Sequence, residues 1–163
     1  MTRHGRRLDL RRTLQGAASF DGELIDLRFR ERRRKQRPIL LLIDVSGSMK
    51  DWTDRYFRFA HTLARVGQQV EVFTLGTHLT RVTRTLRLKN RDRALARTAS
   101  LVSDWDGGTR LGDALATFLK VPRFAGFARG ALVITLSDGL ERQDAANLQA
   151  AAEKMARLCW KHV

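Results

Sequence analysis

The sequence predicts an α/β fold with a doubly wound, mainly parallel sheet. Residues 39–43 and 131–136 are short, mostly aliphatic runs, the length expected for strands buried on both faces. Segments with apolar residues at helical spacing alternate with such runs, which is typical of parallel strands joined by helices. The chain has 163 residues, enough for one domain with a well-packed core.

The predicted elements follow one another in a regular order. The first helix of the domain is capped by Asp51 or Thr53 and ends at Gly67, and the second is capped by Asp92. The Thr and Arg residues of 79–86 predict a half-exposed edge strand, antiparallel to the strand before it because the turn is short. The predicted strands are 39–43, 70–75, 79–86 and 131–136, the predicted helices are 51–66, 92–102, 111–121 and 144–160, and residues 122–130 are a predicted linker.

Residues 1–37 are predicted to be a basic, poorly packed lead-in to a domain at 38–163. The segment LRRTLQGA suits a short helix, and residues 23–29 suit a short extended stretch. The lead-in carries 12 Lys and Arg against 5 Asp and Glu, whereas the remaining 126 residues carry 19 against 12, so each part has an excess of 7 positive charges. The densest part is a basic arm formed by Arg28, Arg30, Arg32, Arg33, Arg34, Lys35 and Arg37.

Two interpretations of this basic arm are open. It binds nucleic acid through phosphate contacts, or it is a solvated connector that also suits an acidic protein partner. We favour the second, because Phe29 is the one aromatic residue among these basic residues and no nucleic-acid-binding motif is recognisable.

The composition also limits the compartment. No apolar run approaches the length of about 18 residues that a membrane span needs, and the basic N-terminus lacks the apolar stretch of a secretory signal. The one cysteine, Cys159, excludes an internal disulfide framework. We therefore expect a cytoplasmic protein without a membrane span.

Two of the buried strands end in an aspartate followed by small residues. The stretches are LLLIDVSGS, which contains Asp44, and LVITLSDG, which contains Asp138. In an open parallel sheet, ligands bind outside the carboxyl ends of the strands where the strand order reverses, so these two carboxylates are expected in one crevice. A glycine-rich loop, GGT at 107–109, brings a further hydroxyl, because its glycines permit a tight turn.

The collected side chains predict a site for a hard divalent cation. The predicted ligands are Asp44, Ser46, Ser48, Thr109 and Asp138. All five offer oxygen, which suits Mg²⁺, or Mn²⁺ or Ca²⁺, and not zinc. Two carboxylates balance the charge of the ion and leave it electrophilic enough to accept an Asp or Glu from a partner. The alternative is that Asp44 and the serines form a helix-capping turn and that Asp138 forms an Asx turn.

These motifs resemble a known family. The order D-V-S-G-S-M, G-G-T and L-S-D-G is similar to the metal-ion-dependent adhesion site, or MIDAS, of von Willebrand factor type A (VWA) domains, over residues 38–160. The resemblance implies that the five predicted ligands hold the metal. We expect a partner-binding rim around them at Met49, Trp105, Gly107 and Gly108, and we expect Trp52 to pack onto the sheet.

A narrower resemblance is to the CoxE-like branch of VWA proteins. It lies in the arginine-rich lead-in and in the segments VEVFTLGTHLTRVTRTL, DWDGGTRLGDAL and SDGLER. It implies an adaptor that assists maturation of a molybdenum-containing carbon monoxide dehydrogenase together with a MoxR-type AAA+ ATPase. Such proteins continue after the last helix with another strand, whereas this sequence ends at CWKHV, so the presence of the last strand is left open.

The sequence argues against an enzyme. Phosphatases with an aspartate after the first strand need a second aspartate two residues later, where this chain has Ser46. No G-x-S-x-G elbow and no P-loop motif is present. We therefore expect a metal-dependent protein-binding adaptor. The alternatives are a nucleic-acid-binding protein that uses the basic arm and, less favoured, a metal-dependent hydrolase.

Overall fold

The computed structural model describes residues 7–17, 27–30, 36–102, 110–139 and 145–163. The chain divides into two compact units, residues 1–35 and 36–163. In the first unit, β1 (Arg7–Leu8) pairs antiparallel with β2 (Phe29–Arg30), and α1 (Leu10–Ala17) follows β1. Asp9 caps this helix, since its carboxylate accepts a hydrogen bond from the Arg12 amide at 3.3 Å. The predicted short helix is therefore present. Of the predicted extended stretch at 23–29, residues 23–26 lie outside the described residues, and Phe29 lies in β2.

The second unit is built on a five-stranded sheet with the order β5-β4-β3-β6-β7. The strands are β3 (Ile39–Asp44), β4 (Val70–Leu75), β5 (Leu79–Arg81), β6 (Leu132–Leu136) and β7 (Lys161–His162). The central strand β3 pairs parallel with β4 and with β6, β6 pairs parallel with β7, and β4 pairs antiparallel with β5. This confirms the predicted mainly parallel sheet with one antiparallel edge strand. The last strand, whose presence the sequence left open, is β7 with two residues.

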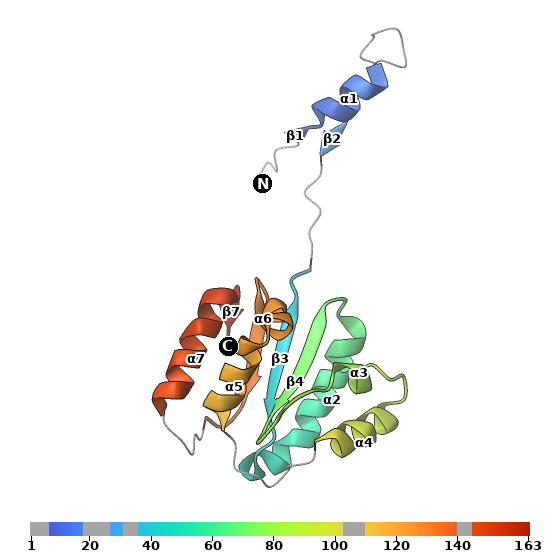
Figure 1. The fold of residues 1–163 in the computed structure, drawn as a ribbon. Helices are drawn as coiled ribbons and strands as arrows, with labels where there is room; N and C mark the ends of the chain where they lie inside the picture. Colours follow the sequence, from blue (N-terminus) through green and yellow to red (C-terminus); the bar gives the residue numbers. More distant parts are fainter. Residues whose placement is uncertain (1–6, 18–26, 31–35, 103–109, 140–144) are drawn as a thin grey trace, which may run out of the picture. The chain divides into compact units, whose positions relative to one another are not determined.

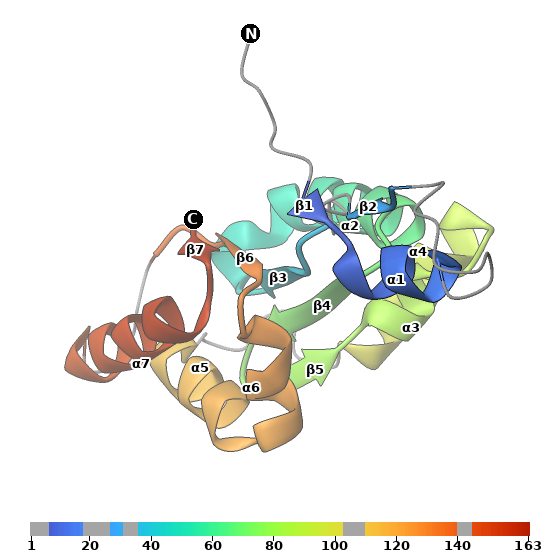
Figure 2. The ribbon, with the colours of Figure 1, turned by 90° about the horizontal axis from the view of Figure 1, so that it is seen from above.

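Helices cover both faces of the sheet (Figure 1; Figure 2). One face carries α2 (Lys50–Val66), α3 (Thr83–Leu86) and α4 (Arg91–Leu101), and the other carries α5 (Leu111–Lys120), α6 (Pro122–Ala128) and α7 (Ala145–Leu158). The aliphatic run of β3 serves both layers, because successive side chains point to opposite faces. Leu40 and Leu42 pack toward α5, α6 and α7, whereas Leu41 and Ile43 pack toward α2. This is a doubly wound core, as predicted.

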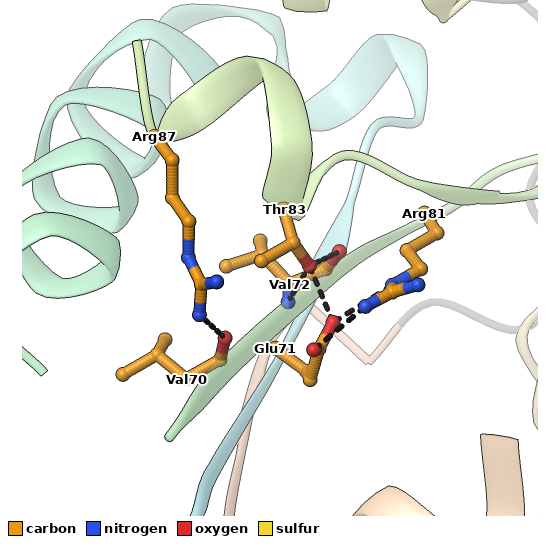
Figure 3. Close-up of polar contacts among 6 residues, drawn as sticks. All are labelled: Val70, Glu71, Val72, Arg81, Thr83 and Arg87. Carbon is orange, nitrogen blue, oxygen red and sulfur yellow. Dashed lines mark hydrogen bonds and ion pairs between the residues drawn. The ribbon is translucent and has the colours of Figure 1, made fainter. Parts of the chain in front are cut away.

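The predicted strand at 79–86 is wrong in its second half, which forms the helix α3. Val82 and Leu86 are fully buried, whereas Arg84, which would share their face in a strand, is exposed, so the burial follows a helical pattern. The chain turns away from the sheet at Thr83, whose hydroxyl accepts a hydrogen bond from the Val72 amide at 2.9 Å and donates to Glu71 at 2.7 Å (Figure 3). These contacts take the place of further strand pairing.

The predicted linker at 122–130 is also wrong, since most of it is the helix α6. Pro122 occupies the first turn of this helix, where its missing N–H costs nothing. The side chain of Phe124 packs against Phe73, with 4.9 Å between the ring centroids, so the segment is part of the core.

Two predicted helix starts are displaced. The cap of α4 is Asn90, whose side chain accepts a hydrogen bond from the Arg93 amide at 2.9 Å, and not Asp92. Helix α2 begins at Lys50, directly after a 3₁₀ turn at Gly47–Met49, so neither Asp51 nor Thr53 caps it. Its predicted end at Gly67 is confirmed.

None of the helices in the described ranges combines the length and the apolar character that a membrane crossing requires.

Candidate metal centre

The candidate site lies at the carboxyl end of the central strand. Asp44 is the last residue of β3 and is fully buried, although it carries a carboxylate. The neighbouring strands β3 and β6 are followed by α2 and α7, which lie on opposite faces of the sheet. This is the kind of crevice, at a reversal of strand order, in which α/β sheets bind ligands.

Two hydrogen bonds orient the Asp44 carboxylate. Its Oδ1 atom accepts a hydrogen bond from the backbone N–H of Ser46 at 2.8 Å. Its Oδ2 atom accepts one from the hydroxyl of Ser137 at 2.8 Å. Each oxygen of a carboxylate has two acceptor positions, so a hydrogen bond to it does not by itself prevent coordination of a cation.

The two predicted serine ligands lie side by side. Ser46 is extended, with φ −60° and ψ 160°, and the 3₁₀ turn at Gly47–Met49 follows it. The turn is closed by a hydrogen bond from the Met49 amide to the Ser46 carbonyl at 3.0 Å. It brings the Oγ atoms of Ser46 and Ser48 to 3.0 Å from one another, within hydrogen-bonding distance. The D-x-S-x-S spacing therefore collects its oxygens through a tight turn after the strand.

This separation fits an octahedral ion. Two oxygens that occupy neighbouring positions around Mg²⁺, each about 2.1 Å from it, are about 3.0 Å apart. The Oγ atoms of Ser46 and Ser48 are 3.0 Å apart. Within the described ranges there is no group of three or more His, Cys, Asp and Glu residues that could hold a metal ion. The described donors at this site are the Asp44 carboxylate and the Ser46 and Ser48 hydroxyls, all oxygen, which suits a hard ion.

The segment after β6 supplies the third motif. Asp138 is exposed, and it follows Ser137, which is tied to Asp44. Gly139 has a φ of 75°, a conformation that favours glycine, and its amide donates a hydrogen bond to the Ser137 hydroxyl at 3.0 Å. Ser137 therefore accepts from its own turn and donates to the neighbouring strand. Sequence reasoning missed this residue, although its place next to a predicted ligand was a signal.

Not all predicted residues can be placed. The predicted ligand Thr109 and the predicted rim residues Trp105, Gly107 and Gly108 lie outside the described residues. The prediction that Met49 belongs to the partner-binding rim is wrong. Its side chain is only 4% exposed and belongs to the core, so it does not form an exposed rim.

A second loop, also missed by sequence reasoning, lies next to Asp44. Gly76 follows β4, and a Cβ atom at this position would lie 3.1 Å from the Val45 side chain, which shows how closely this loop approaches the residue after Asp44. Thr77 and His78 are exposed, and the Thr77 hydroxyl lies 3.0 Å from Nδ1 of His78. These two polar side chains follow the end of β4, the strand adjacent to β3. They are better placed to form a rim than Met49.

The described part of the basic arm is not uniformly solvated. The guanidinium of Arg37 lies over the ring of Trp160, 4.5 Å from its centroid. Arg28 is exposed, and its backbone amide donates to the Thr13 hydroxyl at 3.1 Å. Arg30 lies in β2. Arg32, Arg33, Arg34 and Lys35 lie outside the described residues.

Solved structures share the fold of this chain. Two crystal structures of proximal thread matrix protein 1 from the mussel byssus match with TM-scores of 0.52 and 0.51 at 18% and 20% sequence identity. The second of these is described as having a zinc-occupied MIDAS motif. Each match covers 78% of this chain and 37% of the mussel chain. At this level of identity the likeness shows the fold.

The comparison of sequences decides the family. A search of proteins with curated descriptions gives no match. The sequence model described as "VWA domain containing CoxE-like protein" matches residues 1–163, the whole of the chain. The chain therefore belongs to the family of CoxE-like proteins that contain a VWA domain.

Proposed function

We propose that this domain binds a partner protein through a divalent cation, and that it is a binding protein and not an enzyme. The observation that carries the proposal is the Asp44 carboxylate, buried and oriented by Ser46 and Ser137, with the Ser46 and Ser48 hydroxyls directly beyond it. The residues that would hold the ion are Asp44, Ser46, Ser48, Thr109 and Asp138. Membership of a VWA family supports this assignment.

The proposed ligands contribute either negative charge or neutral oxygen atoms to the site. Asp44 contributes a negative charge from a buried position, and this charge attracts a cation. Ser46 and Ser48 contribute neutral oxygens, and Asp138 contributes a second negative charge from an exposed position. A bound ion supplies a coordination position for a carboxylate of the partner. Thr77 and His78 stand beside this position as polar contacts for the partner.

We propose Mg²⁺ as the ion, with Mn²⁺ and Ca²⁺ as alternatives, because the set of donors is all oxygen. The zinc-occupied site of the mussel protein supports binding of a divalent cation in this fold. Zinc favours nitrogen and sulfur ligands in tetrahedral sites, so we expect it to bind this oxygen site less well than Mg²⁺. A titration with each ion measures this preference.

We further propose that the protein acts in the cytoplasm as an adaptor in maturation of a molybdenum-containing carbon monoxide dehydrogenase. A MoxR-type AAA+ ATPase would be its partner, and the molybdoenzyme would be the client. CoxE-like family membership supports this role. In this arrangement the ATPase supplies the energy, and the VWA domain recognises an acidic side chain on the ATPase or on the client.

The test is a binding measurement with a purified MoxR-type AAA+ ATPase. It is made without nucleotide, so that chelation does not act through Mg²⁺-ATP. We expect binding in the presence of Mg²⁺, loss of binding in EDTA and loss in Asp44→Asn. The matched control is Asp92→Asn, which removes an exposed carboxylate on α4 and leaves the site intact. Binding that survives both EDTA and Asp44→Asn would refute the metal-dependent role.

A further inference from the structure

Helix α2 carries an apolar stripe that the described part of the domain buries only in part. Its core residues, Thr53, Phe57, Ala60 and Ala64, face the sheet. The residue directly before each of these in the sequence is also aromatic or aliphatic. Val66, at the end of the helix, continues this series. The stripe consists of Trp52, Tyr56, Phe59, Leu63 and Val66. Trp52, Phe59 and Val66 are 50%, 48% and 80% exposed, although they are large apolar residues.

The stripe faces away from the neighbouring helices α3 and α4. Each residue of an α-helix is rotated by about 100° from the one before it. The residues directly before the core positions therefore lie on one side of the helix, and the residues directly after them lie on the other side. The residues after the core positions contact the segment between α3 and α4. His61 lies 3.0 Å from the Leu88 carbonyl, and Arg65 donates to the Lys89 carbonyl at 3.3 Å. The stripe is therefore on the other side, toward β6.

The α2 side of β6 is also only partly covered. Ile134 and Leu136 pack against the same core as Tyr56 and Leu63 but remain half-buried, whereas Val133, on the opposite face, is fully buried. The stripe and the sheet meet at a cavity of about 360 Å³ whose lining includes Leu63, Val66, Leu132 and Trp160. The stripe of α2 and the α2-facing residues of β6 together form an apolar surface that is hollowed by this cavity at the end of α2, and we call this surface the α2–β6 groove.

The shape of the groove fits a helix. The stripe residues are spaced alternately by four and three positions, which is the seam of two helices packed side by side. From Trp52 to Val66 the helix advances by 14 residues, about 21 Å at 1.5 Å per residue, which corresponds to four turns. The exposed surface is a face of the sheet and not an edge, so a strand would find no backbone partners there. A helix satisfies its own backbone and can lie on such a face.

The charges around the groove select the occupant. The guanidinium of Arg55 lies over the Trp52 ring at 5.2 Å from its centroid, and that of Arg37 lies over the Trp160 ring at 4.5 Å. Each of these two aromatic side chains therefore holds a cation. The residues that line the cavity include Arg37 and no acidic residue. A second copy of the chain, with a formal charge of +14, would bring its own arginines against these.

We propose that the α2–β6 groove is a docking site for an amphipathic helix with an acidic border on a partner protein. The apolar face of the partner helix covers the stripe, and its Asp and Glu residues lie against Arg55 and Arg37. The site is separate from the metal centre, and the proposal does not rest on metal binding. It gives the domain a second contact surface along the side of the helix that begins at the metal-binding turn.

The test uses a designed peptide, since the partner is unidentified. The probe is a labelled, monomeric peptide of about 18 residues with leucine at alternating four- and three-residue spacing, glutamate on the borders and alanine elsewhere. A second peptide has lysine in place of every glutamate. Fluorescence anisotropy measures binding to the full chain. We expect saturable binding of the acidic peptide, unchanged by EDTA, and at least about tenfold weaker binding of the basic peptide.

Matched variants locate the binding. Phe59→Glu should weaken binding of the acidic peptide at least about tenfold, whereas Thr62→Glu, a change at an exposed residue of the same helix outside the stripe, should leave binding within about twofold. Arg55→Glu should shift the preference toward the basic peptide, and Arg58→Glu, which faces away from the groove, should not. Urea unfolding of each variant shows that the fold persists.

Three results would overturn the proposal. These are no saturable binding of the acidic peptide, equal binding of the two peptides, or equal effects of Phe59→Glu and Thr62→Glu. Sedimentation velocity tests the rival occupant. A dimer that Phe59→Glu dissociates and that excludes the acidic peptide would assign the groove to a second copy of the chain.

Discussion

The hydroxyl of Ser137 donates a hydrogen bond of 2.8 Å to Oδ2 of Asp44, across 93 residues of sequence. This bond joins the carboxyl ends of the adjacent strands β3 and β6, and the predicted ligands Ser46 and Asp138 follow directly along the chain. It makes Ser137 a positioning residue for Asp44. It also links the first and third motifs of the site directly.

We predict that Ser137→Ala weakens divalent-cation binding about tenfold. Removal of a group that orients a metal ligand typically costs about 10–100-fold in affinity. The proposed ligands are unchanged in this variant, so we expect binding to be weakened and not abolished. Isothermal titration calorimetry with Mn²⁺ measures the effect. The control is Ser100→Ala, whose hydroxyl bonds only the Arg97 carbonyl of its own helix among the contacts described, and an equal loss in both variants would contradict the assigned role.

The ion pair of Glu71 and Arg81 gives a prediction for pH dependence. Arg81 donates to both carboxylate oxygens of Glu71, at 2.8 and 2.7 Å, and Thr83 donates to one of them at 2.7 Å (Figure 3). Partial burial opposes the charge and by itself raises the pKa of Glu71, but the hydrogen bonds from Arg81 and Thr83 outweigh it, so the pKa is lowered overall. A carboxylate with a lowered pKa in the folded protein stabilises the fold above its unfolded pKa, and this contribution is lost as pH falls through the folded pKa.

Glu71→Gln should therefore lower the free energy of unfolding by about 1–3 kcal/mol at neutral pH. The difference from the wild type should shrink as the pH falls below the ordinary glutamate value of 4.5. Urea unfolding at several pH values measures both effects. Asp54→Asn is the control, because the ion pair of Asp54 with Arg58 is exposed and should contribute little. A difference that is constant from neutral to acidic pH would contradict the assignment.

His162 holds the last strand by a contact that depends on protonation. Its Nε2 atom lies 2.9 Å from the Thr135 hydroxyl, and burial lowers its pKa below the ordinary value of 6.5. A base with a lowered pKa is favoured neutral in the folded state, so the unfolded state binds protons first and stability falls as the pH drops below 6.5. The Thr135 amide, which donates to the Val163 carbonyl at 2.8 Å, reports on this strand.

We predict that local opening of β7, measured by hydrogen exchange at the Thr135 amide, becomes more frequent between pH 7 and pH 5, after correction for the intrinsic exchange rate. His162→Gln should keep the strand but remove most of this pH dependence, because glutamine does not titrate. An unchanged pH dependence in the variant would show that another group is responsible.

The contact between α5 and α7 depends on a glycine. A Cβ atom at Gly112 would lie 2.9 Å from the backbone nitrogen of Leu148, closer than real Cβ contacts permit. We predict that Gly112→Ala lowers the free energy of unfolding by about 1–3 kcal/mol, since the two helices must separate. At Gly126, in α6, a Cβ atom meets nothing within 4 Å, so Gly126→Ala should be neutral or stabilise by about 0.5–1 kcal/mol. Thermal or urea unfolding compares the two, and equal effects would contradict this account of the packing.

The sequence predicted the elements whose signal is local. The strand β3 begins with a consecutive apolar run at residues 39–43 because both its faces are buried, and D-x-S-x-S is a single turn. The misses depend on contacts between distant residues. Helix α3 forms where Thr83 reaches Glu71, and α6 is helical because Phe124 has a place against Phe73. The role of Ser137 appears only once β6 lies beside β3.

Two further residues show the same limit. Met49 lies within the predicted metal motif, but its side chain enters the core because the 3₁₀ turn rotates it inward. We expected Trp52 to pack onto the sheet. It is half-exposed and stacks on Tyr56, with 6.3 Å between the ring centroids. A hydrophobic residue on an amphipathic helix does not reveal by itself which neighbour covers it.

Calorimetric titration of the chain with Mg²⁺ and Mn²⁺, in parallel with Asp44→Asn, tests the central claim most directly. The account predicts saturable binding of one ion per chain, and its loss in Asp44→Asn while the fold persists. Absence of saturable binding, or equal binding by Asp44→Asn, would contradict it.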